Sequence, residues 1–200
     1  MSGDNIPLTP EFLLSAYAAG YFPMAESRDA KEIHWFYPEL RGVIGLEKFH
    51  IPASLAKFMR KKNFTITTDK VFPEVITACA DTPRDGTWIN DTIIRLYCEL
   101  WKKNYAHSVE CWSGDELVGG LYGVSLGGAF FGESMFSRKP NASKVALVHL
   151  VELLRGAGYT LLDTQYTNEH LQQFGVAEIP REEYLKRLKK ALKVTPKQCF

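Results

Sequence analysis

The sequence lacks several features that would assign it to a specialised class of protein. Its four cysteines, Cys79, Cys98, Cys111 and Cys199, form no CxxC pair, which argues against a zinc ribbon or a disulfide scaffold and suits a reducing compartment. No apolar run approaches the roughly 20 residues that cross a bilayer, and the start of the chain has no signal-peptide pattern. The five histidines show no metal spacing such as HExxH. We therefore expect a cytoplasmic protein without metal, cofactor or membrane contact.

An excess of charge of one sign is also missing. The net charge is +1, so any contact with nucleic acid must come from a local basic cluster. The densest cluster lies on an amphipathic helix expected over residues 50–64, where Lys57, Arg60 and Lys61 form either a solvated face or a phosphate contact. With 200 residues, 46% of them apolar, the chain can form one core or a core with a small satellite domain.

The stretch Leu117–Arg138 carries the most informative pattern. Two strand-like runs, 117–124 and 129–136, flank a Ser-Leu-Gly-Gly turn, which predicts a hairpin. Alternation in the second run places Glu133 on the same face as Phe131 and Met135. A carboxylate within an apolar strand is costly to bury unless something binds it, so Glu133 is a candidate site residue.

The other segments alternate between helical and strand-like patterns. Helices are expected from Thr9, from a cap at Asp69, and around residues 94–101, 142–156, 169–174 and 181–192; strands are expected at 43–46, 64–68, 106–112 and 159–165. Residues 21–41 are dense in aromatics and look irregular, which indicates either the packing of a small lobe or a stacking platform. On the strand at 159–165, a period of two puts Asp163 and Gln165 on one face, where both need partners.

From residue 106 onward, three strands joined by tight turns are followed by a helix and a further strand. This order makes a mixed sheet, antiparallel first and parallel after, and resembles the N-acetyltransferase (GNAT) superfamily. We expect an α+β (mixed α/β) fold with a small lobe of residues 1–39 packed on a GNAT-like domain of residues 40–200. The helix is preceded by SRKPNASK, which lacks the glycines of acetyl-CoA users, so CoA binding is not expected. The GVSLG segment matches a hydrolase nucleophile motif, but that motif needs a helix where a strand is expected.

Nine segments, in their order, resemble the leucyl/phenylalanyl-tRNA–protein transferase family: LLSAYAAGYFPM, FHIP, GTWI, HSVECW, ELVGGLYGV, FFGESMFSR, NASKVAL, LLDTQ and EIPR. The resemblance runs from about Leu13 to about Leu188. It implies an enzyme that transfers Leu or Phe, and Met more weakly, from aminoacyl-tRNA to proteins with an N-terminal Arg or Lys, which marks them for degradation. Aminoacyl-tRNA and such acceptor proteins are the implied partners, and we expect a monomer.

The resemblance also assigns site residues. Its catalytic constellation falls on Glu133, Asp163 and Gln165, which the strand patterns also single out. Positions around the terminal adenosine of the tRNA match Trp88, Tyr17, Tyr97 and Met24. The amino-acid pocket matches Leu121, Phe130, Met135, Leu147, Leu150, Leu154 and Leu162, and Lys57, Arg60 and Lys61 would contact the tRNA backbone.

For some of these residues, the sequence also allows another interpretation or departs from the family pattern. Trp88 equally suits a loop residue that plugs the edge of a core. Many family members have Trp at the position of Met24, and a relative can have Arg at the position of Ala53, which would strengthen its contact with tRNA.

We expect the side-chain carbonyl of Gln165 to accept a hydrogen bond from the attacking amine. Asp163 would orient that amide or pair with the cationic side chain of the acceptor, and Glu133 would bind an ammonium group near the ester. Two rival functions are an acyltransferase of GNAT type with another donor and a non-catalytic protein that binds tRNA or degrons.

Overall fold

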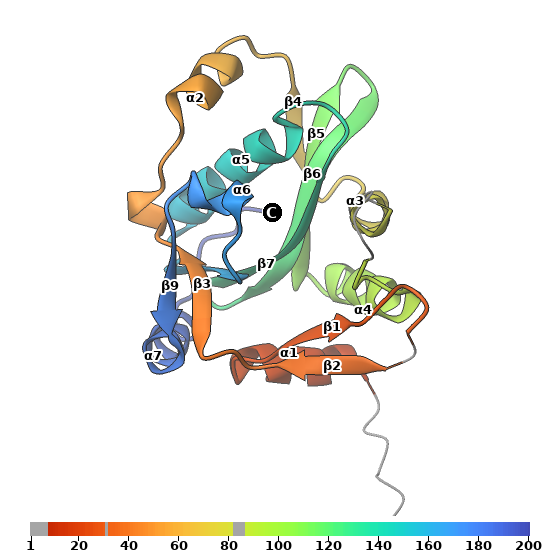
Figure 1. Cartoon of the computed structure of the whole chain (residues 1–200), viewed down its shortest axis with the longest axis vertical. Helices are drawn as coiled ribbons and strands as arrows, with labels where there is room; N and C mark the ends of the chain where they lie inside the picture. The colour runs from red at the N-terminus through yellow and green to blue at the C-terminus, as the bar shows by residue number, and fades with distance from the viewer. Residues whose placement is uncertain (1–7, 31, 82–86) are drawn as a thin grey trace, which may run out of the picture.

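The structure is a computed structural model that describes residues 8–30, 32–81 and 87–200 (Figure 1). Its elements in chain order are α1 (Pro10–Ala18), β1 (Phe22–Ala25), β2 (Ile33–Phe36), β3 (Leu40–Ile44), a 3-10 turn η1 (Leu46–Lys48), α2 (Ala53–Met59), β4 (Thr65–Thr68), α3 (Phe72–Ala80), α4 (Asp91–Lys102), β5 (Ala106–Ser113), β6 (Glu116–Leu126), β7 (Ala129–Ser137), α5 (Ala142–Ala157), β8 (Leu161–Gln165), α6 (Glu169–Gln172), β9 (Val176–Pro180) and α7 (Arg181–Ala191).

A seven-stranded mixed sheet, in the order β4-β5-β6-β7-β8-β3-β9, forms the centre of the molecule. Strands β4 to β7 pair antiparallel with their neighbours, and β8 then joins β7 in parallel through the crossover helix α5. Strands β3 and β9 complete the sheet in antiparallel register. The predicted α+β class with a mixed sheet is therefore confirmed.

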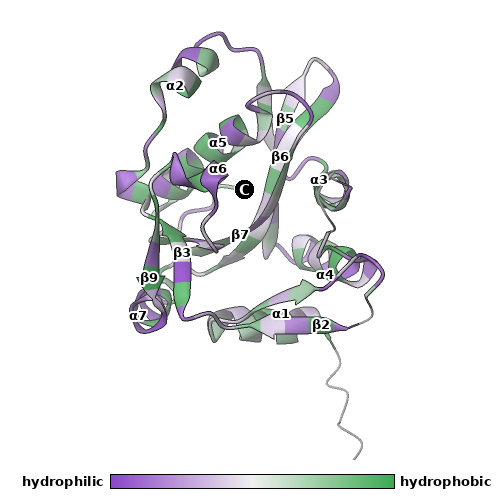
Figure 2. Ribbon diagram, in the orientation of Figure 1, coloured by the Kyte–Doolittle hydropathy of each residue, from purple (hydrophilic) through white to green (hydrophobic). Residues whose placement is uncertain are grey.

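Helices cover both faces of this sheet (Figure 1). Helices α1, α3, α4 and α7 bury their apolar sides in one core, which we call the α3/α4 core and which contains Tyr17, Ile76, Tyr97 and Leu188. The other core, the α5 core, joins α2, α5 and α6 to the opposite face. Helix α7 is largely purple in Figure 2 because lysines occupy its exposed side. In the described part of the chain, no helix is both long and apolar enough to cross a membrane.

Strand β7 departs from simple alternation at Glu133. Tyr122 faces Ser134 across the ladder but Gly123 faces Gly132, so Glu133 is an extra residue in a β-bulge. The extra residue reverses which side chains point to which face. Phe131 consequently packs in the α3/α4 core and Met135 against the α5 core, so the prediction that they share a face is wrong.

Residues 21–41 are more regular than expected. Strands β1 and β2 pair antiparallel in a separate two-stranded sheet, and β3 begins at Leu40. Strand β9 was not predicted because only Val176 and Ile179 of its five residues meet a core. Asp69 does not cap α3: its backbone has a φ of 54°, and its carboxylate bonds His107 and the amide of Ser108.

The proposed division into residues 1–39 and 40–200 stays a prediction. The N-terminal elements share their core with the rest of the chain, since the rings of Tyr17 and Phe131 lie 4.8 Å apart. Tyr17 therefore reaches from α1 directly to the central strand β7.

Candidate active site

A cavity of about 580 Å³ lies between strands β6 to β8 and helices α5 and α6. Five of the seven residues expected in an amino-acid pocket line it: Leu121, Met135, Leu147, Leu150 and Leu162. The other two, Phe130 and Leu154, do not line it and are fully buried in the α5 core behind it. Glu133, Thr164 and Gln165 form part of the polar side of the cavity.

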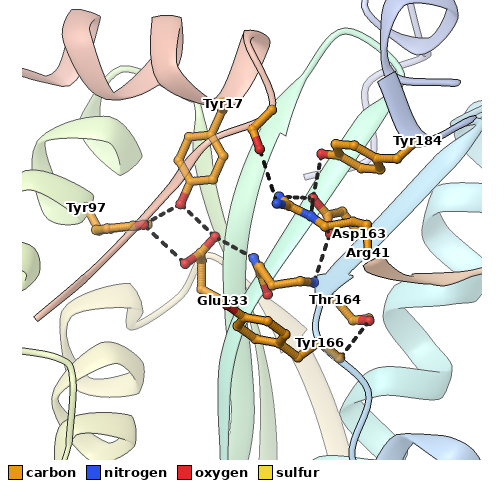
Figure 3. A network of polar contacts seen from close by, with 10 residues as sticks. Tyr17, Arg41, Tyr97, Glu133, Asp163, Thr164, Tyr166 and Tyr184 are labelled. Carbon is orange, nitrogen blue, oxygen red and sulfur yellow. Dashed lines mark hydrogen bonds and ion pairs between the residues drawn. The ribbon is translucent and has the colours of Figure 1, made fainter. Parts of the chain in front are cut away.

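Glu133 is the centre of a hydrogen-bond network (Figure 3). Its Oε1 accepts hydrogen bonds from the Tyr17 hydroxyl at 2.6 Å and from Gln165 Nε2 at 3.1 Å, and its Oε2 accepts one from the Tyr97 hydroxyl at 3.1 Å. The two tyrosine hydroxyls also contact each other, and because they carry only two hydrogens, all three contacts are hydrogen bonds at once only when Glu133 is protonated and donates one of them. Burial raises the pKa of Glu133 to about 7, and the two tyrosine hydrogen bonds oppose this rise. Near neutral pH, Glu133 therefore exists in both protonation states.

Asp163 forms a second, fully buried part of the network. Arg41 donates to Asp163 Oδ2 through Nη2 at 2.7 Å and to Oδ1 through Nε at 2.9 Å, and the Tyr184 hydroxyl donates to Oδ2 at 2.7 Å. The guanidinium carbon of Arg41 lies 4.4 Å from the centre of the Phe22 ring and 4.6 Å from that of Tyr184. Both oxygens of this buried carboxylate are already paired, which favours the first of its two expected roles, orienting Gln165, over pairing with the acceptor.

Asp163 instead acts on the backbone of Gln165. Its Oδ1 accepts the Gln165 amide hydrogen at 2.8 Å, which holds Gln165 at a φ of 57°. Gln165 turns its side chain to Glu133 and so joins the two halves of the network. The turn passes close to Gly42 on β3, where a Cβ atom would lie 2.7 Å from the carbonyl carbon of Tyr166. Glycine is required at position 42 for this reason.

The residues expected around the tRNA adenosine fall into two groups. Tyr17 and Tyr97 are fully buried and hold Glu133, so their rings present no face for stacking on a base. Trp88 and Met24 are partly exposed and lie near each other, because the Ala25 amide donates to the Trp88 carbonyl at 3.3 Å. Neither of them lines the cavity.

The basic cluster lies at the end of α2. Lys57, Arg60 and Lys61 are all exposed, and none forms an ion pair with another described residue. The site residues that sequence reasoning missed include Arg41 and Tyr184, which bond Asp163, and the cavity-lining Ser143, Thr164, Asn168 and His170. An arginine inside the run Leu40–Ile44 was the available signal for the first of them. Within residues 8–30, 32–81 and 87–200, no group of His, Cys, Asp or Glu could hold a metal ion.

Comparison with known proteins identifies the chain as an aminoacyltransferase. The family model described as leucyl/phenylalanyl-tRNA protein transferase matches residues 43–189, and the model of that family's N-terminal domain matches residues 7–39. The chain belongs to the leucyl/phenylalanyl-tRNA protein transferase family. The resemblance found in the sequence and the prediction of an enzyme are both confirmed.

Three curated relatives carry the name Leucyl/phenylalanyl-tRNA–protein transferase. The relative from Paramagnetospirillum magneticum is 55% identical over 191 residues, which cover 94% of this chain and 91% of the relative. That from Salinibacter ruber is 54% identical over 189 residues, covering 94% and 82%. That from Gloeobacter violaceus is 56% identical over 187 residues, covering 94% and 95%. A solved structure of L-PGS from Bacillus licheniformis is 16% identical with a TM-score of 0.46, over 90% of this chain and 68% of that one, which is too low to support an argument.

Proposed function

We propose that the chain transfers Leu or Phe, and Met less efficiently, from aminoacyl-tRNA to the α-amino group of proteins that begin with Arg or Lys, and so marks them for degradation. Transfer of an aminoacyl group from tRNA to protein follows from family membership. The choice of Leu, Phe and Met is proposed from the cavity of about 580 Å³. Its wall along α5 is apolar, and Gln165 and Glu133 form its end. Its volume is that of a typical site for a small organic group.

The apolar wall supports selection of large hydrophobic side chains. Leu121, Leu147 and Leu150 offer no hydrogen-bond partner, so a polar side chain would lose its water without compensation. One missing methylene is worth only about 1–3 kcal/mol in such a pocket. Rejection of Val and Ile therefore depends on the shape of the branch point rather than on polarity.

The reaction needs positioning more than a nucleophilic side chain, because the aminoacyl ester is already activated. The acceptor α-amine, with a typical pKa of about 7.7–8.0, is partly neutral at physiological pH. It attacks the ester carbonyl carbon, the new amide bond forms, and the ribose oxygen leaves with a proton. Correct placement of the two reactants can lower the barrier by about 7–11 kcal/mol.

In this proposal, Gln165 places the amine. Its Nε2 is held by Glu133, which turns its side-chain oxygen into position to accept a hydrogen bond from the attacking nitrogen. The ionised form of Glu133 attracts the amine's positive charge or takes up its proton. Asp163 positions Gln165 through its backbone and does not touch the substrate.

The tRNA would reach the cavity along the exposed basic and aromatic residues. We propose that Trp88 and Met24 contact the terminal adenosine and that Lys57, Arg60 and Lys61 contact phosphates, while Tyr17 and Tyr97 support Glu133 from behind. The order β5-β6-β7-β8 with α5 as a parallel crossover supports a GNAT-like domain. At the start of α5, the Ser143 amide donates to the Ser137 hydroxyl at 3.2 Å and is not free for a CoA pyrophosphate, in keeping with the lack of glycine in SRKPNASK. The four free cysteines support a cytoplasmic location.

A transfer assay tests this function. Labelled Leu-, Phe-, Met-, Val- and Ile-tRNA are each offered with peptides beginning with Arg, Lys, Ala or Asp. We expect Leu-, Phe- and Met-tRNA to label the peptides that begin with Arg or Lys. Ribonuclease treatment of the charged tRNA before the reaction should abolish this labelling. Transfer from an acyl-CoA would favour the rival acyltransferase, and tRNA binding without transfer would contradict the proposal.

A further inference from the structure

We propose that Ser143 and Lys144, at the start of α5, bind the phosphate that joins the terminal adenosine of the tRNA to the preceding nucleotide; this rests on the proposed function above. The cavity is polar at two separate places. Glu133 and Gln165 form the reacting end, while Ser137 on β7 and Ser143 on α5 line it elsewhere. The proposed transfer reaction leaves this second polar place without a ligand.

The first turn of α5 offers a hydrogen-bond donor that the fold does not use. Asn141 precedes the helix at a φ of 69° and makes no side-chain cap. The Ser143 amide donates to the Ser137 hydroxyl at 3.2 Å, but the Lys144 amide has no partner among the described residues. An amide left over at the positive end of a 16-residue helix attracts an anion. A single amide suits one phosphate rather than a pyrophosphate.

The side chain of Ser143 points to a ligand independently of the helix end. It is only 4% exposed and lines the cavity, as do Leu147 and Leu150 one and two turns further along the same helix face. Its hydroxyl bonds no other residue in the described part of the chain. A buried hydroxyl without a partner costs free energy, so this one is a contact for a polar group that enters the cavity.

Lys144 supplies the positive charge. Helical side chains lean towards the N-terminus of their helix, and the Lys144 ammonium donates at 3.1 Å to the neutral Gln173, which directly follows α6 at the edge of the cavity. No described Asp or Glu forms an ion pair with Lys144. Phe64, just beyond α2, packs against the small apolar cluster that contains Ala142, the first residue of α5. Lys144 therefore extends the basic surface of α2 to the cavity.

The distance between the two polar places selects the last phosphate of the tRNA. Glu133 and Ser137 are four positions apart on β7, which at about 3.3 Å per residue is roughly 13 Å. Six bonds of about 1.5 Å join the ester carbonyl carbon to the phosphorus of the same nucleotide and span roughly 8 Å when extended. With a contact of about 3 Å at each end, this phosphate reaches Ser143 while the ester lies at Gln165. The preceding phosphate lies a whole nucleotide further away.

The test uses two small donors in place of the tRNA and a peptide that begins with Arg as acceptor. Both donors are phenylalanyl esters of the dinucleotide cytidylyl-adenosine, one with the natural phosphate and one with an uncharged methylphosphonate. We expect the wild-type enzyme to have a lower KM for the phosphate donor. Ser143→Ala should raise that KM roughly tenfold, as for a lost hydrogen bond to a charged group.

Lys144→Gln should raise the KM for the phosphate donor roughly fivefold, as for an exposed ion pair, and leave the KM for the methylphosphonate donor unchanged. Lys144→Arg should keep the preference for the phosphate. The KM for the peptide and the kcat at saturating donor should stay at the wild-type values in all three variants, whereas a folding defect would alter them.

The control is Lys139→Gln, because the ammonium of Lys139 already contacts Glu116 and the Ser113 hydroxyl, each at 3.0 Å. It should behave as wild type with both donors. If the wild-type enzyme shows no preference for the phosphate donor, or if Ser143→Ala and Lys144→Gln keep the whole preference, the phosphate site is refuted and the proposed function stands. If the wild-type enzyme transfers Phe neither from these donors nor from Phe-tRNA, the proposed function itself is refuted.

Discussion

Replacement of Glu133 by Gln should stabilise the protein at alkaline pH while it removes activity. Gln keeps every hydrogen bond of the network. Its Oε1 can accept from Tyr17 and Gln165, its Nε2 can donate to Tyr97, and Tyr97 can then donate to Tyr17. The substitution therefore removes the ionisation of Glu133 and little else.

The magnitude follows from the pKa of Glu133, which burial raises from 4.5 to about 7. A carboxylic acid whose folded-state pKa is raised stabilises the protein fully below its unfolded pKa and loses that contribution as pH rises through the folded one. At about 1.4 kcal/mol per pH unit, the free energy of unfolding of the wild type should fall by up to about 3 kcal/mol between pH 4.5 and pH 7. The Gln variant should not show this loss.

The assay is urea denaturation of both proteins from pH 4.5 to pH 8.5, with transfer activity measured on the same samples. We expect similar stability of the two proteins at pH 4.5 and a Gln variant that is more stable by up to about 3 kcal/mol above pH 7. Parallel stability curves over the whole range would show that Glu133 titrates normally and would refute the reasoning.

Three further predictions concern the same site and the tRNA contact. Asp163→Asn should lower the free energy of unfolding by about 3–5 kcal/mol because it leaves Arg41 buried without a charge partner. The Arg41→Met/Asp163→Leu double variant should show a smaller decrease in urea denaturation, and a decrease under about 1 kcal/mol for the single variant would contradict the prediction. Gln165→Asn should lower kcat by about 10²-fold with a small change in stability, since Asn tolerates a φ of 57° but is too short to reach the amine; near-normal kcat would exclude the proposed role. The triple variant Lys57→Gln/Arg60→Gln/Lys61→Gln should raise the KM for aminoacyl-tRNA and reduce the slope of log affinity against log salt by roughly 2, whereas an unchanged slope would show that α2 makes no phosphate contact.

Much of the site could be predicted from strand patterns alone. Glu133, Asp163 and Gln165 stood out because polar groups in apolar strands need partners, and the structure brings the three together. The same rule also selects Glu110 on β5, which is fully buried but lies outside the cavity lining, where the hydroxyls of Ser108 and Thr67 bond it. The rule therefore finds buried acids, and only the neighbouring cavity separates a site residue from a structural one.

The features that could not be predicted depend on contacts distant in sequence. The bulge at Glu133 is defined by the register between β7 and β6, and the residue pattern of one strand does not predict it. The partner of Asp163, Arg41, lies 122 residues earlier in the chain and comes together with it only when β3 pairs with β8. Tyr17 and Tyr97 could be assigned to a base contact or to a core, and their complete burial became visible only with both helices in place.

The network described above also has a consequence for the protein's own synthesis. Tyr17 from the first helix holds Glu133, and Tyr184 from the last helix holds Asp163, so the reacting groups depend on residues from both ends of the fold. A growing chain still lacking α7, or a proteolytic fragment without α1, lacks one of the contacts that order the polar groups beside the cavity. Such partial products would be poor aminoacyltransferases, so transfer would be confined to complete copies of the enzyme.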